Sequence, residues 1–407
     1  MKIAIMGFGV VGSGVGEIVS GSPDSLKKRC GEEIEIARIL DLRDFPDSKF
    51  DCFTKDFNDI LNDPEIGVVA EVMGGTKPAY EFTKQLLESG KHVVSSNKEL
   101  VAKHGTELLQ IAREHNVNYL FEASVGGGIP IIRPLYSSLI SNELTEVMGI
   151  LNGTTNYILT QMIKEGASFE DALKGAQEKG YAEKDPTADV EGHDTCRKIA
   201  ILSSLAFGKY VDSEEIPTEG ITKITLEDVA YAEEFGAAIK LLGMANRAED
   251  GVYARVCPVM LKKTNPLAGI DDVFNGILVK GDALGDVMFY GRGAGSLPTA
   301  SAVVSDIMDA VKHKNKHIIL GWTEGEEGYL KCGDEQKFRY YVRLFGNSEA
   351  SADFCRDGFN VISLDGEKYA NEFAVFTPEM TGFEFEEFKT AELGGFDILG
   401  SIRLVMD

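Results

Sequence analysis

The sequence predicts an α/β fold in which a doubly wound parallel sheet is followed by an α+β domain and a small C-terminal unit. Short apolar segments alternate with helical segments from Lys2 to Glu122, and this alternation stops after residue 130. The chain has 407 residues. A single hydrophobic core rarely grows beyond about 250–300 residues, so we expect more than one domain.

Domain boundaries are expected where these patterns change. Residues 1–130 and about 291–325 form the first domain, because the helix predicted at 296–311 has an apolar stripe that suits a return to it. Residues 131–290 form the second domain. Residues 330–407 form the third, whose predicted elements follow the order βαββαβ and include a helix at 349–355 and a last strand at 397–405.

The composition of the chain disfavours several classes of partner and site. Lys and Arg number 41 and Asp and Glu number 65, which gives a net charge of −24. This negative charge disfavours nucleic acid and anionic membranes as partners. No apolar stretch is long enough to span a bilayer. The six cysteines form no C-x-x-C pair, so we expect reduced thiols in a cytoplasmic protein without a zinc site.

The first predicted strand, Lys2–Met6, leads into a glycine-rich turn. Gly7, Gly9 and Gly12 have the G-x-G-x-x-G spacing. The first glycine permits a tight turn, the second lets the backbone approach a pyrophosphate, and the third lets helix and strand pack closely. A plain strand–helix turn would look similar. The position at the start of a strand–helix alternation favours a Rossmann dinucleotide site.

The second predicted strand, residues 34–40, bears on the choice of cofactor. An acid at its end, such as Asp41, would accept hydrogen bonds from a ribose 2′-OH and favour NAD. An arginine, such as Arg43, would hold a 2′-phosphate and favour NADP. Both residues are present, so the sequence leaves NAD and NADP open.

Two further strand ends place polar residues at the same edge of the sheet. Strand 66–73 ends at Gly74, Gly75 and Thr76, and strand 92–95 ends shortly before Lys98. Ligands of doubly wound sheets bind at the carboxyl ends of the strands. We therefore count Gly74, Thr76 and Lys98 among the candidate site residues. The alternation is completed by helices at 78–89 and 99–115 and a strand at 118–122.

Three consecutive glycines follow Glu122 and precede Pro130. Glycine allows unusual backbone angles that expose carbonyl groups. Carbonyls with one carboxylate could hold a hard monovalent cation, by analogy with the oxygen ligands of calcium. A strained turn at a domain hinge explains the same residues.

The second domain begins with a predicted strand at 145–151 and an NGTTN run at 152–156, in which Thr154 or Thr155 can cap the helix 156–164. A helix at 169–179 precedes a polar segment, residues 180–198, and a helix that continues to Gly208. Asp194 and Lys198 share one face of that helix. They form either a surface ion pair or, beside a cleft, a proton-transferring lysine next to a carboxylate.

Taken together, these motifs resemble homoserine dehydrogenase over about residues 1–320. They are GFGVVGSG, SSNKELVAKHG, EASVGGGIPII, GILNGTTNYIL, GYAEKDPTADVEGHDTCRKIAIL and YGRGAGSLPTASAVVSDI, in that order. The resemblance implies interconversion of L-homoserine and L-aspartate 4-semialdehyde with NAD or NADP, in threonine and methionine biosynthesis. It also implies a homodimer or homotetramer, with residues 131–290 as the substrate and dimerisation domain.

The resemblance also implies roles for individual residues. Lys198 matches the catalytic lysine, Glu183 and Asp194 match substrate-binding acids, Asp189 matches a neighbouring acid, and Lys98 matches a lysine on the nucleotide side. Further cofactor contacts are implied at Phe8, Val10, Val11, Gly180, Glu183, Gly293 and Gly295. A sodium site is implied at Glu122 and the carbonyls of Val125, Gly127 and Ile129. Lys184 departs from the family, which usually has proline there.

The C-terminal unit and the activity also have alternative interpretations. The C-terminal unit resembles an ACT regulatory domain, but its first loop, residues 345–349, lacks the usual D-x-P-G. A degenerate effector site and a packing module are therefore equal alternatives. The chain could also be a different Rossmann oxidoreductase, of another small amino or hydroxy acid. A non-catalytic nucleotide sensor is the third alternative.

Overall fold

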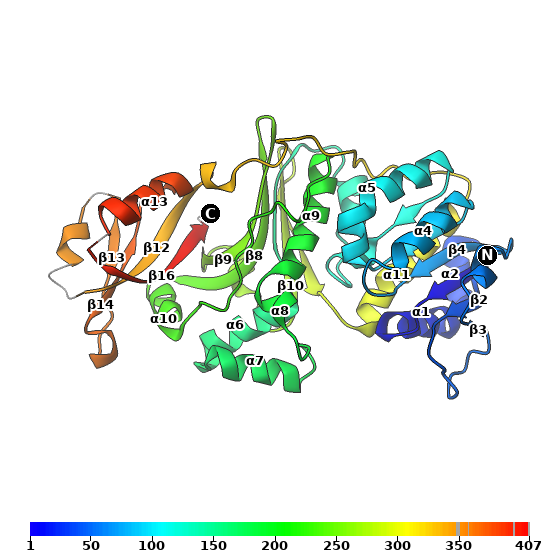
Figure 1. The fold of residues 1–407 in the computed structure, drawn as a ribbon, viewed down its shortest axis with the longest axis horizontal. Coiled ribbons are helices and arrows are strands. Elements are labelled where there is room, and N and C mark those ends of the chain that lie inside the picture. Colours follow the sequence, from blue (N-terminus) through cyan, green and yellow to red (C-terminus); the bar gives the residue numbers. More distant parts are fainter. Residues whose placement is uncertain (347–350, 357, 394, 406–407) are drawn as a thin grey trace.

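The computed structural model describes residues 1–346, 351–356, 358–393 and 395–405. Figure 1 shows three regions in a row: an N-terminal α/β domain, a central domain built on a long sheet, and a C-terminal unit at the far end. Within the described residues, no helix combines the length and the apolar character that a membrane crossing requires.

The N-terminal domain contains a six-stranded sheet in the order β3-β2-β1-β4-β5-β6, and all neighbouring strands are parallel. Its strands are β1 (Lys2–Met6), β2 (Glu35–Leu40), β3 (Phe53–Thr54), β4 (Ile66–Glu71), β5 (His92–Ser95) and β6 (Tyr119–Leu120). The direction of winding changes between β1 and β4, which is where ligands of such sheets bind. The predicted doubly wound parallel sheet is confirmed.

Helices cover this sheet. They are α1 (Val10–Gly21), α2 (Pro23–Cys30), α3 (Asn58–Leu61), α4 (Ala79–Glu88), α5 (Lys98–Glu114) and α11 (Ser296–Lys312). The last of these returns from the central domain and packs on α1 and β4. A Cβ at Gly14 of α1 would lie 2.9 Å from the Ala300 Cβ of α11. Glycine at this position therefore allows the two helices to approach closely.

The central domain is an antiparallel sheet in the order β11-β10-β7-β8-β9. Its strands are β7 (Leu144–Ile150), β8 (Ala237–Ala248), β9 (Gly251–Lys262), β10 (Phe274–Gly281) and β11 (Gly285–Arg292). Its helices are α6 (Gly153–Glu165), α7 (Phe169–Glu178), α8 (Thr187–Val190), α9 (His193–Phe207) and α10 (Leu226–Glu234).

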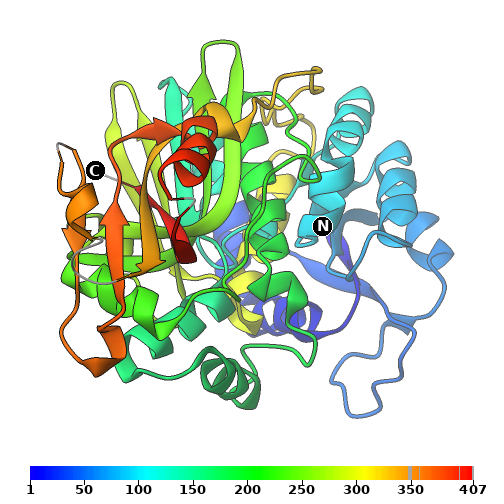
Figure 2. The same cartoon turned by 60° about the vertical axis from the view of Figure 1, so that its left-hand side comes forward.

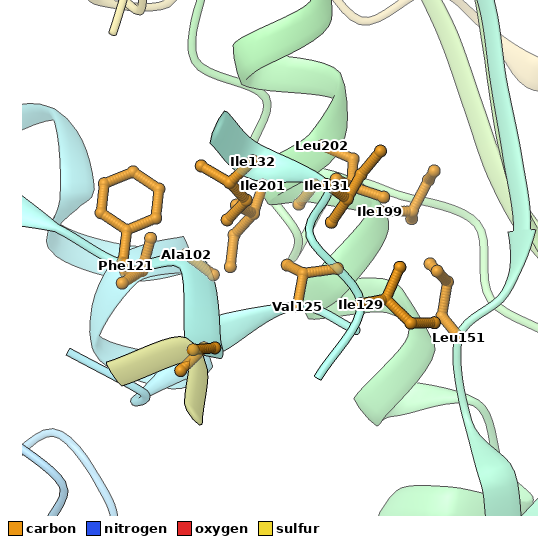
Figure 3. Close-up of a cluster of buried hydrophobic side chains, with 14 of the residues drawn as sticks. Ala102, Phe121, Val125, Ile129, Ile131, Ile132, Leu151, Ile199, Ile201 and Leu202 are labelled. Atoms are coloured by element: carbon orange, nitrogen blue, oxygen red, sulfur yellow. The ribbon is translucent and has the colours of Figure 1, made fainter. Parts of the chain in front are cut away.

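Helix α9 joins the two domains because it packs on α5 from one side and on β7, β8 and β9 from the other. Figure 3 shows the buried cluster at this junction, where Ile199 and Leu202 of α9 lie among Val125, Ile131 and Leu151. Side chains from both domains thus form one core. This shared core fixes the start of α9 relative to the start of α5.

The predicted cap of α6 is wrong. The helix begins at Gly153, three residues earlier than predicted, and its N-cap is Asn152. The Asn152 Oδ1 accepts a hydrogen bond from the Thr155 amide at 2.9 Å. Asparagine is at least as good an N-cap as threonine, and here it occupies the last extended position before the helix.

The C-terminal unit contains β12 (Lys337–Phe345), β13 (Asn360–Ile362), β14 (Glu372–Phe376), β15 (Met380–Thr381), α13 (Gly382–Ala391) and β16 (Asp397–Val405). Its strand order is β16-β12-β14-β13, and all neighbours in this order are antiparallel. Strand β16 also pairs in parallel with β9, so these strands extend the central sheet. Figures 1 and 2 show the extension from two sides.

The predicted helix at 349–355 and the loop at 345–349 lie partly outside the described residues. The described part of that helix contains a short 3-10 turn, Ala352–Phe354.

Buried charges attach the C-terminal unit to α10. Arg343 of β12 is 6% exposed. Its guanidinium lies 3.1 Å from the Asp228 carboxylate and 2.9 Å from Glu372. The Tyr341 hydroxyl donates to Asp228 at 2.9 Å. Successive residues of a strand point to opposite faces, so Tyr340 and Val342 pack in the core beneath α13 instead.

Candidate functional site

An interdomain cleft of about 630 Å³ contains every residue that is predicted for catalysis or substrate binding. Its walls come from the first residue of α5, the start of α6, the segment 179–189 with the start of α8, the start of α9, and the segment before α11. The predicted residues among its lining are Lys98, Gly180, Glu183, Asp189, Asp194, Lys198, Gly293 and Gly295. The fold therefore brings together residues that are up to about two hundred positions apart in the chain.

Three of these residues form what we call the lysine–aspartate cluster: Lys98, Asp194 and Lys198. Asp194 is 4% exposed and lies in the first turn of α9. Its Oδ2 lies 2.6 Å from the Lys198 Nζ, and its Oδ1 forms an ion pair with the Lys98 Nζ. Lys198 is buried, whereas the Lys98 side chain is 40% exposed. The cluster is thus a buried carboxylate between two lysines at the cleft wall.

Asn152 supports this cluster, although no sequence pattern marks it as a site residue. Its Nδ2 donates to Asp194 Oδ2 at 2.8 Å and to Asp189 Oδ1 at 2.7 Å. The preceding carbonyl, of Leu151, accepts from Lys198 Nζ at 2.7 Å. The NGTT run at a strand end was visible in the sequence. Nothing local in that run indicated contact with residues about forty positions later.

The electrostatics of the cluster favour acid–base work. Burial opposes ionisation of Asp194, but the charges of Lys198 and Lys98 outweigh it and hold the pKa of that carboxyl well below its usual range. Burial lowers the pKa of the Lys198 ammonium, and the charge of Lys98 lowers it further, although Asp194 opposes both. Burial, with the nearby Asp194 charge, raises the pKa of Asp189. A lysine whose pKa is lowered exchanges protons more readily near neutral pH.

Glu183 lines the cleft but lies outside the cluster. Its side chain is exposed, and its backbone carbonyl accepts a hydrogen bond from Gln177 Nε2 at 3.1 Å. Within the part of the chain that the structure describes, no ion pair is formed by its carboxylate. Glu183 therefore presents a negative charge that a cationic ligand group could meet.

The glycine turn has the geometry of a dinucleotide loop. Gly7 has φ of +93°, in the region that favours glycine. A Cβ at Gly12 would lie 1.9 Å from the Gly7 carbonyl oxygen. Both positions therefore require glycine. The start of α11 lies beside the turn, because the Ser296 hydroxyl donates to the Val10 carbonyl at 2.7 Å. The nearby Gly293 and Gly295 are thus close to this loop and to the cleft.

Asp41 and Arg43 are paired with each other at the edge of the loop. The Asp41 carboxylate accepts hydrogen bonds from the Phe8 amide at 2.7 Å and from the Arg43 guanidinium at 2.9 and 2.8 Å. These bonds, with Arg43 first, hold the pKa of Asp41 well below its usual range. Arg43 is 63% exposed and lies over the Phe45 ring. The Asp41 carboxylate is thus hydrogen-bonded within the protein, whereas much of the Arg43 side chain is accessible to a ligand.

Hydrogen bonds and close packing within the protein hold the turn after Glu122. The Glu122 carboxylate accepts three backbone hydrogen bonds, from Ile131 at 2.7 Å, Ile132 at 2.8 Å and Arg133 at 2.7 Å. A Cβ at Gly127 would lie 2.5 Å from the Gly293 carbonyl oxygen. Close packing of two segments therefore accounts for this glycine. Among the described residues, no group of three or more His, Cys, Asp or Glu side chains is arranged to hold a metal ion.

Comparison with known proteins gives consistent results. A family model described as "Homoserine dehydrogenase" matches residues 130–308, and one described as "Homoserine dehydrogenase, NAD binding domain" matches residues 7–122. A homoserine dehydrogenase of Synechocystis is 47% identical over 76% of this chain and 73% of its own length. One of Bacillus subtilis is 43% identical over 77% and 73%.

Solved structures extend the similarity to the whole chain. A homoserine dehydrogenase from Thiobacillus denitrificans has a TM-score of 0.90 and 35% identity, and the match covers 100% of this chain and 98% of that one. A hyperthermophilic archaeal homoserine dehydrogenase in complex with NADPH has a TM-score of 0.66 and 27% identity, over 76% of this chain and 97% of that one.

Proposed function

This chain belongs to the homoserine dehydrogenase family, and we propose that the lysine–aspartate cluster performs the proton transfer of the reaction. As a member of this family, the chain is an oxidoreductase that interconverts L-homoserine and L-aspartate 4-semialdehyde with a nicotinamide cofactor, in aspartate-family biosynthesis. The observation that carries the proposal is the buried Asp194 carboxylate between two lysines. Membership of this family excludes the two alternatives, a Rossmann oxidoreductase of another small acid and a non-catalytic nucleotide sensor.

The residues that we propose for the cofactor fit a dinucleotide. The glycine turn at 7–12 would hold the pyrophosphate, since a side chain at Gly12 would fill its own turn. The residues Gly74, Thr76, Gly293 and Gly295 would flank the pyrophosphate. Gly180 and Glu183 would lie towards the nicotinamide end of the cofactor. When bound, the nicotinamide supplies the acceptor for the hydride.

Lys198 is the group that we propose takes the alcohol proton. Oxidation of homoserine removes a hydride from carbon and a proton from oxygen, so the protein must accept the proton. The neutral Lys198 amine accepts it, and in the reverse reaction the ammonium returns it to the carbonyl oxygen. Burial lowers the pKa of Lys198, so the neutral form is easier to reach. The Lys98 ammonium stabilises negative charge on the substrate oxygen.

The acids of the cleft have separate proposed roles. Both oxygens of Asp194 are engaged by lysines and Asn152, so this residue acts on substrate mainly by holding Lys198 and Lys98. The exposed Glu183 is our candidate for the ammonium group of homoserine. Asp189 accepts a hydrogen bond from the same Asn152 amide as Asp194, so its proposed role is to help hold Asn152 beside the cluster.

Glu183→Gln tests this assignment. We expect the KM for homoserine to rise about tenfold or more, because the amide keeps the shape of the side chain but loses the charge that attracts the ammonium. The KM for the cofactor should stay within about twofold. Steady-state kinetics measure both values, with Glu178→Gln on the exposed end of α7 as the matched control. A change confined to the cofactor KM would assign Glu183 to the nucleotide instead.

For the choice between NAD and NADP, we propose that the protein uses both and that Arg43 contacts the 2′-phosphate of NADP. The support is geometric. A Cβ at Gly9 would lie 3.9 Å from the Arg43 Nη2, so the guanidinium lies beside the glycine turn. Asp41 engages one edge of that guanidinium, and most of the side chain stays exposed. Paired with Arg43, Asp41 also repels a phosphate less than a free carboxylate would.

Arg43→Ala should therefore weaken NADP selectively. We expect the KM for NADP to rise about tenfold, in line with the loss of a charge-assisted hydrogen bond, while the KM for NAD changes little. Parallel titrations with the two cofactors provide the measurement, and Arg29→Ala on the exposed surface of α2 is the control. An equal loss for both cofactors would mean that Arg43 only holds Asp41 and the glycine turn.

A sodium ion at the turn after Glu122 remains a separate proposal. The Glu122 carboxylate fits poorly as a direct ligand, because three backbone amides already occupy it. The carbonyls of Val125, Gly127 and Ile129 would supply the ligands. We derive no catalytic step from this ion.

We also propose a homodimer or homotetramer in the cytoplasm. The six cysteines are free thiols, as a reducing compartment would keep them. For the C-terminal unit we propose an ACT-like module whose effector site is degenerate. The support is its antiparallel strand order, which is the order of a split βαβ arrangement. The buried ion pair between Arg343 and Asp228 joins this unit to α10.

A further inference from the structure

A buried acid of the N-terminal domain lies outside the lysine–aspartate cluster and outside the residues that line the cleft. Glu71 is the last residue of β4 and is 0% exposed. The other residues of that strand are glycine or apolar (Ile66, Gly67, Val68, Val69 and Ala70). Glu71 forms no ion pair within the described residues. A buried carboxyl group without a cation is costly, so its retention at the carboxyl edge of the sheet calls for a reason.

The hydrogen bonds of Glu71 lead to the start of α5. Its Oε2 accepts from the Ser95 hydroxyl at 2.6 Å, and its Oε1 accepts from the Met73 amide at 2.9 Å. The Ser95 Oγ in turn accepts from the Asn97 amide at 3.0 Å. Glu71 thus connects the end of β4 with the residue that precedes Lys98.

Asn97 is the branch point of this network. Its Oδ1 caps α5 by accepting from the Leu100 amide at 3.0 Å, and its Nδ2 donates to the Gly75 carbonyl at 2.7 Å. Lys98 is the first residue of the helix that Asn97 caps. The same network therefore fixes the Gly74–Thr76 turn and the base of the Lys98 side chain.

We propose that Glu71 is a positioning residue that acts through Ser95 and Asn97 to hold the Lys98 ammonium against Asp194. The proposal rests on the function proposed for the lysine–aspartate cluster. An ionised carboxylate can only accept hydrogen bonds, so it requires the Ser95 hydroxyl to donate. That orientation leaves the Ser95 lone pairs free to accept from the Asn97 amide, and the cap of α5 is fixed.

The protonation of Glu71 would change this pattern. Burial raises the pKa of Glu71 to about 7, although Ser95, Met73 and Asn97 oppose the rise by hydrogen bonding. The titratable group facing it is the buried Tyr119 hydroxyl of β6, and burial raises the pKa of that group well above its usual range. Near neutral pH, Glu71 is therefore the group that titrates. Protonated, it becomes a donor and no longer dictates the direction of the Ser95 hydroxyl.

Glu71→Gln is the first test, carried out on the full chain with homoserine. We expect kcat at pH 8 to fall about 10–100-fold, as a small misplacement of a catalytic group can cost about 10²-fold. The dependence of kcat on pH between about 6 and 8 should flatten relative to wild type. The unfolding midpoint at pH 8 should not fall, because a buried carboxylate with a raised pKa destabilises the fold above that pKa. Glu88→Gln on the exposed end of α4 is the control.

A double variant separates this inference from the function on which it rests. If Glu71 acts through Lys98, Lys98→Ala with Glu71→Gln should be no slower than Lys98→Ala alone. Losses that multiply would overturn the inference, as would a Glu71→Gln kcat within about twofold of wild type. A normal kcat for Lys98→Ala would instead overturn the role of the cluster. Should Glu71→Gln fail to fold, Ser95→Ala removes the same link and is judged by the same outcomes.

Discussion

Lys198→Ala is expected to lower kcat for homoserine oxidation by about 10²–10⁴-fold, the usual cost of removing a positioned acid–base group. Lys198 is buried beside Asp194 and the Leu151 carbonyl in the central domain, whereas the glycine turn belongs to the N-terminal domain. Cofactor affinity should therefore be unchanged, which fluorescence titration of the reduced cofactor can measure.

The control for this variant is Lys174→Ala, which removes an exposed lysine of α7. It should leave kcat unchanged. A near-normal kcat for Lys198→Ala, with the fold intact, would remove Lys198 from the chemistry. A loss of cofactor binding of the same size would place it in the nucleotide site.

Asp194→Asn is expected to have the second largest effect, a fall in kcat of about 10²-fold or more. The amide cannot pair with both lysines, so two ammonium groups are left close together without their shared carboxylate. Homoserine affinity should fall as well, and cofactor affinity should change less.

The pH profile gives this variant a specific signature. In the wild type, Asp194 raises the pKa of Lys198, against burial and the charge of Lys98, which lower it. Removing the carboxylate takes away the strongest of the charges that raise the pKa of Lys198, so the acidic limb of the residual oxidation rate should shift towards lower pH. An unmoved limb would show that another group sets the pH dependence. The matched control is Asp250→Asn, an exposed acid in the turn between β8 and β9.

The N-terminal domain could be predicted well from the sequence because its signals are local. Strands 2–6 and 92–95 have the predicted bounds, as does the last strand, 397–405. The glycine turn is predicted by its G-x-G-x-x-G spacing together with its position after the first strand. A Cβ at Gly12 would collide with Gly7 within the same turn. Such a requirement involves residues that are close together in the chain, so the sequence pattern reveals it.

The parts that could not be predicted depend on distant contacts. Strand β9 is buried along nearly its whole length, so its residues lack the alternation that marks a half-exposed strand. The bridge from Asn152 to Asp189 and Asp194 spans about forty residues. The Phe8 amide donates a hydrogen bond to the Asp41 carboxylate, and this bond bears on cofactor choice. It is likewise a contact between residues that are far apart in the chain.

The central claim is that the Lys198 amine accepts the alcohol proton, and Lys198→Arg tests it most directly. Arginine keeps the positive charge and can pair with Asp194, but its guanidinium does not lose a proton in proteins. The measurement is the rate of nicotinamide reduction with homoserine, with malate and aspartate as comparison substrates. We expect wild type to oxidise homoserine but neither malate nor aspartate, and Lys198→Arg to be as slow as Lys198→Ala. An arginine variant that retains a tenth or more of the wild-type kcat would contradict this role of Lys198.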